Sequence, residues 1–239
     1  MHIGILETGR PSEDLMAVHK DYPHMCQRLL EEAGSDLEFS QFAVLDGELP
    51  KDPAQCDAWM ITGSKFGVYE GHDWIERLKS FLRQAYDRDV PIIGICFGHQ
   101  ILAEALGGKV IKSDKGWGVG VHSYPIRETR DWMEAGKEAL SIQAYHQDQI
   151  VDLPPDATVL AGTDFCPNAM LVYGNKALSF QGHPEFQADY AEDLIKARRG
   201  VLLAKDVADK ALKTVRDQSD SNLAARWILN FLRDHQSVA

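Results

Sequence analysis

The sequence predicts an α/β fold in which an open, mostly parallel sheet lies between layers of helices. Short apolar segments rich in β-branched residues alternate with longer segments whose apolar residues recur at helical spacing. Some of the short segments also end in glycine-containing turns, as at Gly63 and Gly98. Strands that alternate with helices pair in parallel through right-handed crossovers, so a three-layer architecture is expected.

The first part of the chain is predicted to contain three strands and one interrupted helix. Helical spacing extends from residue 13 to residue 33, with Ser12 as the expected cap and Gly34 as the terminator. Pro23 should break or kink this helix, because proline lacks the N–H that a helix interior uses. The predicted strands are residues 2–6, 37–45 and 57–62.

The middle of the chain places a cysteine between a strand and a helix. Residues 73–87 have the pattern of an amphipathic helix, and the apolar run 91–95 leads to Cys96. Gly98 then opens another helical pattern. The N–H groups and positive end of that helix favour a thiolate, which makes Cys96 a candidate nucleophile. Free cysteines are also commonly buried in cores, and this stretch alone leaves both interpretations open.

The second half of the chain is predicted to complete the sheet and then to become helical. Short connections favour antiparallel pairing for part of this region, so the sheet is predicted to be mixed. The glycine-rich segment 116–120 is interpreted as a bend at a sheet edge. The predicted strands are residues 109–112, 121–126, 141–145, 158–163, 169–173 and 177–181.

Helical spacing resumes at Ala188 and continues to the C-terminus. We expect one domain over residues 1–200 and a helical extension over residues 201–239 that docks on it. Ser221 is the expected cap of the last helix. The apolar stripe of that helix fits a core contact, and a subunit interface is the alternative.

Composition excludes several classes of partner. The formal net charge is −11 and there is no basic cluster, which argues against nucleic-acid binding. No apolar run is long enough for a membrane span, and the first six residues resemble a strand instead of a signal peptide. The four cysteines are widely spaced without a CxxC pair, which fits thiols in a reducing compartment. We therefore expect a cytoplasmic protein without disulfides or a zinc site.

A second short motif supplies a base for the candidate nucleophile. His183, Pro184 and Glu185 directly follow an apolar predicted strand. Nucleophilic catalysis by cysteine needs a base within hydrogen-bond reach and an acceptor that orients the base. His183 and Glu185 fit these two roles, although a histidine on a turn is more commonly a surface or core residue.

The two motifs together resemble those of class I (triad) glutamine amidotransferases. The pattern Gly-x-Cys-x-Gly-His-Gln at residues 94–100 and Gly-His-Pro-Glu at residues 182–185 carry the resemblance, which extends from residue 1 to about residue 190. It implies a flavodoxin-like fold and a catalytic triad of Cys96, His183 and Glu185. It implies no metal or other cofactor.

The resemblance also assigns residues to substrate binding. Gln100 matches the residue that helps to hold glutamine, and the backbone N–H groups of Phe97 and of the Gly63 region match the oxyanion hole. Residues 145–148 match a stretch at the substrate end of the site, which makes His146 and Asp148 candidates for lining it. His99 has no catalytic counterpart and is expected to be structural.

The implied reaction is attack of a thiolate on the side-chain amide of glutamine or of another γ-glutamyl compound, through a γ-glutamyl thioester. Residues 63–69 and 73–75 look closest to stand-alone relatives of the amidotransferase domain of GMP synthase, some of which cleave γ-glutamyl peptides. Lys65 and Tyr69 depart from the GMP synthase pattern and are expected to affect the leaving-group side. The alternatives are a glutaminase subunit that delivers ammonia to a separate synthetase, and a non-catalytic binding module.

Overall fold

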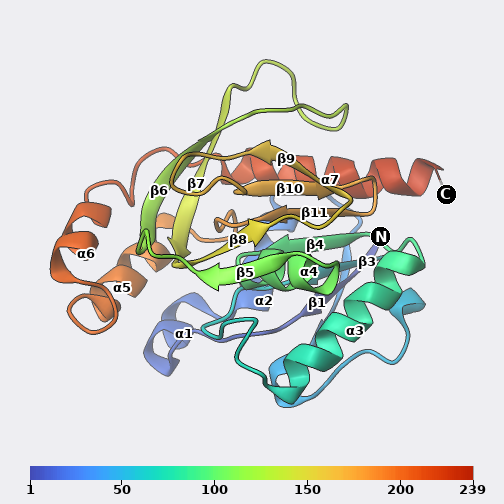
Figure 1. Cartoon of the computed structure of the whole chain (residues 1–239), viewed down its shortest axis with the longest axis horizontal. Helices are drawn as coiled ribbons and strands as arrows, with labels where there is room; N and C mark the ends of the chain where they lie inside the picture. The colour runs from blue at the N-terminus through green and yellow to red at the C-terminus, as the bar shows by residue number, and fades with distance from the viewer. Residues whose placement is uncertain (239) are drawn as a thin grey trace.

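A seven-stranded sheet forms the centre of the computed structural model, which describes residues 1–238 (Figure 1). Its strand order is β2-β1-β3-β4-β11-β10-β9. The first five strands in this order are parallel, whereas β10 and β9 pair antiparallel at one edge. The strands are β1 His2–Leu6, β2 Glu38–Phe42, β3 Ala58–Ile61, β4 Ile92–Ile95, β9 Ala157–Ala161, β10 Met170–Tyr173 and β11 Ala177–Phe180.

Helices cover both faces of this sheet, so the predicted three-layer α/β fold with a mixed, mostly parallel sheet is confirmed. On one face α3 (Asp73–Asp87) and α4 (Phe97–Ala105) bury their apolar side chains against the sheet. On the other face the sheet packs against α2 (Tyr22–Glu31) and α7 (Ser221–Val238). The bounds of α3 are those predicted from its periodicity, because its apolar positions all face the core.

Two antiparallel pairs lie beside the main sheet. One pair consists of β6 (Gly118–Pro125) and β7 (Ala139–His146), and Figure 1 shows it as a long ribbon that rises away from the sheet. The other consists of β5 (Lys109–Lys112) and β8 (Asp148–Asp152). The sequence did not predict β8, whose aspartates at both ends disfavour a strand. Nor did it predict that β6 begins inside the glycine-rich segment.

The interrupted helix is two helices, and its break precedes the proline. The first helix, α1 (Glu13–His19), ends at Lys20, which has a φ of 67°. Asp21 then caps α2, because its side chain accepts a hydrogen bond from the His24 N–H. Pro23 therefore lies in the first turn of α2, where its missing N–H has no cost. Ser12 precedes α1, but its side chain makes no capping hydrogen bond.

The C-terminal region contains α5 (Ala188–Arg198), α6 (Lys205–Ala211) and α7. The prediction that Ser221 caps the last helix is wrong, since Ser221 is the first residue of α7 itself. Trp227 and Ile228 of α7 are fully buried in the same core as Ile5 of β1. The division at residue 200 stays a prediction, but α7 shares the central core. Within residues 1–238 no helix has both the length and the apolar character needed to cross a bilayer.

Candidate active site

Three neighbouring strands bring the two sequence motifs together. In the sheet β4 lies between β3 and β11 (Figure 1), with Ile61 beside Gly94 and Phe180 beside Ile95. All three strands are parallel, so their carboxyl ends meet at one edge, where ligands bind in open α/β sheets. The segments that follow them carry Gly63, Cys96 and His183.

Cys96 lies on a strained turn between β4 and α4. Its backbone has a φ of 52° and a ψ of −100°, a conformation that L-residues rarely adopt. Two glycines permit this turn. A Cβ on Gly94 would lie 2.6 Å from the Gly98 carbonyl oxygen, and one on Gly98 would lie 2.5 Å from the Ile61 carbonyl oxygen. The backbones therefore approach more closely than any side chain would allow.

His183 is held between a carboxylate, a sulfur atom and an aromatic ring. Its Nδ1 lies 2.7 Å from Glu185 Oε1, and the Glu185 side chain is fully buried. Cys96 is also close enough to the ring to act on its protonation. The ring stacks on Phe186 at 3.9 Å between centroids, and the His183 N–H donates to the Gln143 carbonyl oxygen at 2.7 Å. Cys96, His183 and Glu185 thus form one continuous chain of contacts.

The charges in this chain favour a protonated imidazole. Burial opposes protonation, but the negative charges of Glu185 and Cys96 outweigh it and raise the pKa of His183 to about 10. Glu185 Oε2 has no hydrogen-bond partner among the described residues, so its charge acts mainly on the imidazole. The arrangement suits a histidine that accepts and returns a proton beside a thiol.

A pair of glutamine side chains links Cys96 to the neighbouring strand β8. Gln181 Nε2 donates to the Cys96 Sγ at 3.8 Å. Gln100 Nε2 donates to Gln181 Oε1 at 3.1 Å and to the Asp148 carbonyl oxygen at 2.9 Å. Sequence reasoning missed Gln181. Its place directly after β11, two residues before His183, could have indicated it.

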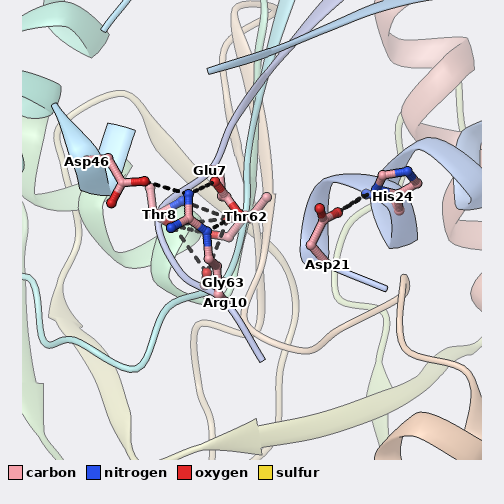
Figure 2. A network of polar contacts seen from close by, with 8 residues as sticks. All are labelled: Glu7, Thr8, Arg10, Asp21, His24, Asp46, Thr62 and Gly63. Atoms are coloured by element: carbon pink, nitrogen blue, oxygen red, sulfur yellow. Dashed lines mark hydrogen bonds and ion pairs between the residues drawn. The ribbon is translucent and has the colours of Figure 1, made fainter. Parts of the chain in front are cut away.

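The backbone at Gly63 lies against both the thiol and the imidazole. A Cβ on Gly63 would lie 3.0 Å from His183 Cε1 and 3.8 Å from the Cys96 Cβ. Figure 2 shows that Thr8 fixes this segment, because its hydroxyl donates to the Thr62 carbonyl oxygen at 2.9 Å and approaches the Gly63 carbonyl oxygen at 3.2 Å. The Phe97 N–H, at the first position of α4, has no acceptor within its helix.

The other residues singled out in the sequence, His146, Asp148 and His99, are held by hydrogen bonds of their own. His146 is buried, its Nδ1 lies 3.2 Å from the Asp148 carbonyl oxygen, and burial lowers its pKa to about 3. Burial also raises the pKa of Asp148, whose Oδ2 accepts from the Tyr69 hydroxyl at 2.8 Å. His99 is fully buried and lies 2.7 Å from the Ser179 hydroxyl, away from the thiol, as a structural residue would.

A cavity of about 390 Å³ opens over the cysteine. Its lining includes five of the predicted site residues, which are Gly63, Cys96, Gln100, His146 and His183. Phe97 and Glu185 do not line it, since they lie behind Cys96 and His183. Among residues 1–238 no three His, Cys, Asp or Glu side chains are grouped as metal ligands.

Comparisons with known proteins match most of the chain. The family model described as glutamine amidotransferase class-I matches residues 17–198. A glutamine amidotransferase-like protein of Schizosaccharomyces pombe is 30% identical over 97% of this chain and 98% of its own length. Gamma-glutamyl peptidase 5 of Arabidopsis thaliana is 34% identical over 93% of this chain and 92% of its own length.

A solved structure has the same fold. The glutamine amidotransferase of Thermotoga maritima superposes with a TM-score of 0.78 and 21% identity, over 97% of this chain and 99% of that one. The comparison therefore extends the likeness beyond residue 198, to the region that the family model leaves out.

Proposed function

The chain belongs to the class I glutamine amidotransferase family, and we propose that it hydrolyses the γ-amide bond of glutamine or of another γ-glutamyl compound. The observation that carries the proposal is the chain of contacts from Cys96 through His183 to Glu185, beside a cavity that takes a small molecule. The similarity to a gamma-glutamyl peptidase supports a γ-glutamyl donor.

In the first half of the reaction the Cys96 thiolate attacks the γ-carbonyl carbon. The carbonyl π electrons move to oxygen, where the N–H groups of Phe97 and Gly63 stabilise the negative charge. When the tetrahedral intermediate collapses, the C–N bond breaks and protonated His183 gives its proton to the departing nitrogen. The products of this half are a γ-glutamyl thioester on Cys96 and a free amine or ammonia.

In the second half water hydrolyses the thioester. Neutral His183 takes a proton from the water as its oxygen attacks the carbonyl carbon. Collapse of the second tetrahedral intermediate breaks the C–S bond, releases glutamate and restores the thiolate beside protonated His183. Glu185 keeps the imidazole oriented through both halves.

The γ-glutamyl group is expected to bind between α4 and β8. Gln100 uses both amide protons on Gln181 and on the Asp148 carbonyl, so its Oε1 is the atom left to accept from a substrate ammonium group. His146 and Asp148 border the same side of the cavity. His146 is neutral there because burial holds its pKa near 3.

Glutamate release tests this proposal. We expect the purified protein to release glutamate from glutamine or a γ-glutamyl dipeptide, and Cys96→Ala or His183→Ala to lower the rate at least 100-fold with the fold intact by circular dichroism. Cys56→Ala is the matched control, because Cys56 is buried beside His2 and precedes β3, whereas the site lies after the other end of that strand.

The outcomes separate the alternatives. Equal rates for wild type and Cys96→Ala would refute the mechanism. Activity on glutamine that appears only after a cell extract is added would favour a glutaminase subunit for a synthetase. No release from any donor, with or without extract, would favour a binding module.

A further inference from the structure

The cavity continues past His183 to an end lined by two tyrosines, a tryptophan and an arginine. Phe186 stacks on His183, and Tyr22 in turn stacks on Phe186 at 5.8 Å between centroids. Tyr145 packs against Trp117 at 5.3 Å. Arg198 is close enough to interact electrostatically with both tyrosines. We call Tyr22, Trp117, Tyr145 and Arg198 the distal end of the cavity, and all four line it.

Four cations line the cavity, Arg10, Lys65, Lys112 and Arg198, and Arg198 is the one at the distal end. Glu7 and Asp46 both bind the Arg10 guanidinium, at 2.7 Å each (Figure 2), so its charge is already compensated. Lys65 lies over the Phe66 ring, and Lys112 acts on the Asp148 carboxylate, which borders the proposed γ-glutamyl position. Within the described part of the chain, no ion pair or hydrogen bond engages the Arg198 side chain. Its half-buried charge is therefore available to an anion.

Two tyrosine hydroxyls beside Arg198 are available as donors. Tyr190 donates its proton to the Tyr22 hydroxyl, which leaves the Tyr22 proton free to be donated. The Tyr145 hydroxyl is buried, and no described residue bonds to it. A buried hydroxyl without a partner is costly, so a bound acceptor would stabilise it. Burial raises the pKa of Tyr22 to about 12 and raises that of Tyr145 further, so both remain protonated donors.

The position of the distal end assigns it to the leaving group. His183 must reach the departing nitrogen to protonate it, so the leaving group extends on the His183 side of the scissile bond. The hydrogen bonds of Gln100 and Asp148 join α4 to β8 and Tyr69, whereas the ring contacts of His183 lead to Phe186 and Tyr22. The γ-glutamyl part is therefore assigned to the first group and the leaving group to the second. Beyond His183 the leaving group meets Phe186, Tyr22 and then Arg198.

Resting on the proposed hydrolysis, we propose that Tyr22, Tyr145 and Arg198 bind the carboxylate of the amino acid or peptide that departs from the γ-glutamyl group. A guanidinium and two hydroxyls match the acceptor oxygens of a carboxylate. Trp117 forms an apolar wall for the adjoining side chain. The protein is then a peptidase selective for γ-glutamyl donors whose leaving group carries a free carboxylate, and glutamine is a poor donor.

A matched pair of donors tests this subsite. We expect wild type to hydrolyse γ-glutamyl-alanine with a kcat/KM about 10- to 100-fold above that for γ-glutamyl-alaninamide, which differs only in the leaving-group carboxylate. Arg198→Gln should lower kcat/KM for γ-glutamyl-alanine by a similar factor and leave that for the carboxamide within about twofold. Tyr145→Phe removes a single hydroxyl and should reduce the ratio of kcat/KM for γ-glutamyl-alanine to that for γ-glutamyl-alaninamide severalfold.

The controls distinguish the subsite from the activity itself. Lys196→Gln removes an exposed charge from the same helix. It should leave kcat/KM unchanged for both donors, since Lys196 pairs with Glu192 outside the cavity. Equal wild-type kcat/KM for both donors would overturn the subsite and leave the proposed hydrolysis standing. An equal loss on both donors in Arg198→Gln would show a structural role and also overturn it. Hydrolysis of glutamine but of neither dipeptide would also overturn the subsite and leave the proposed hydrolysis standing. No hydrolysis of glutamine or of either dipeptide by wild type would refute the proposed function.

Discussion

At the scale of single residues, the site depends on a buried carboxylate that acts on an imidazole. Glu185 is fully buried and touches His183 through one oxygen only. A carboxylate removed from water in this way is costly unless its charge is compensated, and protonated His183 compensates it. The stability of the protein and the protonation of His183 are therefore linked.

This linkage predicts a pH dependence of stability. The pKa of His183 is raised from 6.5 to about 10 in the folded state, so the folded state binds this proton more tightly than the unfolded state. The resulting stabilisation is full below about pH 6.5 and is lost as the pH rises through 10. Glu185→Gln removes a charge that raises this pKa, so the free energy of unfolding should depend less on pH across this window. Urea denaturation of wild type and of Glu185→Gln from pH 6.5 to 10 gives the free energy of unfolding of each protein as a function of pH. The same dependence on pH in both proteins would contradict the prediction.

Sequence motifs located some site residues and not others for a physical reason. Cys96 and His183 stand in short patterns with a chemical meaning of their own. Gln181 and Arg198 have no such pattern. Gln181 reaches the sulfur because β11 pairs with β4 in one particular register. Arg198 meets Tyr145 only because α5 packs near the base of the β6–β7 ribbon, and local periodicity contains neither fact.

At the scale of elements, the close contact between α4 and β3 positions the cysteine. The helix approaches the strand so closely that no Cβ fits at Gly98. The same glycine lies in the first turn of α4, where it contributes to the exposed N–H groups beside Cys96. The packing of one helix on one strand thus fixes the backbone geometry at Cys96.

Gly98→Ala separates packing from helix propensity. Propensity predicts that alanine stabilises a helix by about 0.5–1 kcal/mol relative to glycine. Packing predicts the opposite sign, a loss of about 1–3 kcal/mol, because the new methyl group would meet the Ile61 carbonyl oxygen at 2.5 Å. Urea denaturation measures the free energy of unfolding, and stabilisation by this substitution would refute the close approach.

Elements were predictable where the pattern was long, and less so where a strand depended on its partner. The 15-residue helix α3 was located at both ends from its own periodicity. The five-residue strand β8 was missed, since it is a strand by virtue of pairing with β5, from Val110 opposite Ile150 to Lys112 opposite Asp148. Asp148 at its start is also the residue whose carbonyl anchors Gln100.

At the scale of the whole molecule, α7 and the sheet share one core. Trp227 is among the largest fully buried side chains, and its neighbours in the core come from β1, β4 and β11. An extension that merely docked on a finished domain would cover its surface and leave the core of the domain unchanged. The packing therefore predicts that α7 unfolds together with the sheet.

Trp227→Ala tests this cooperativity. Loss of the buried ring should lower the free energy of unfolding by about 3–5 kcal/mol. Unfolding should remain a single transition, with the same midpoint whether it is followed by the circular dichroism of the helices or by activity. Arg226→Ala, on the exposed side of the same turn, should cost about 1 kcal/mol or less, because it breaks a surface pair with Glu134. Loss of α7 signal before the loss of activity would instead support a separable extension.

The parallel pairing of β4 with β11 determines when, during synthesis of the chain, Cys96 and His183 can come together. These strands are adjacent in space, but the 80 residues 96–175 lie between Ile95 and Lys176, whose carbonyl accepts a hydrogen bond from the Ile92 N–H. A nascent chain synthesised as far as β8 already contains Cys96 and lacks its base entirely. The thiol meets His183 only when synthesis has passed β11 and the long-range pairing has closed, so the proposed hydrolysis requires the finished sheet.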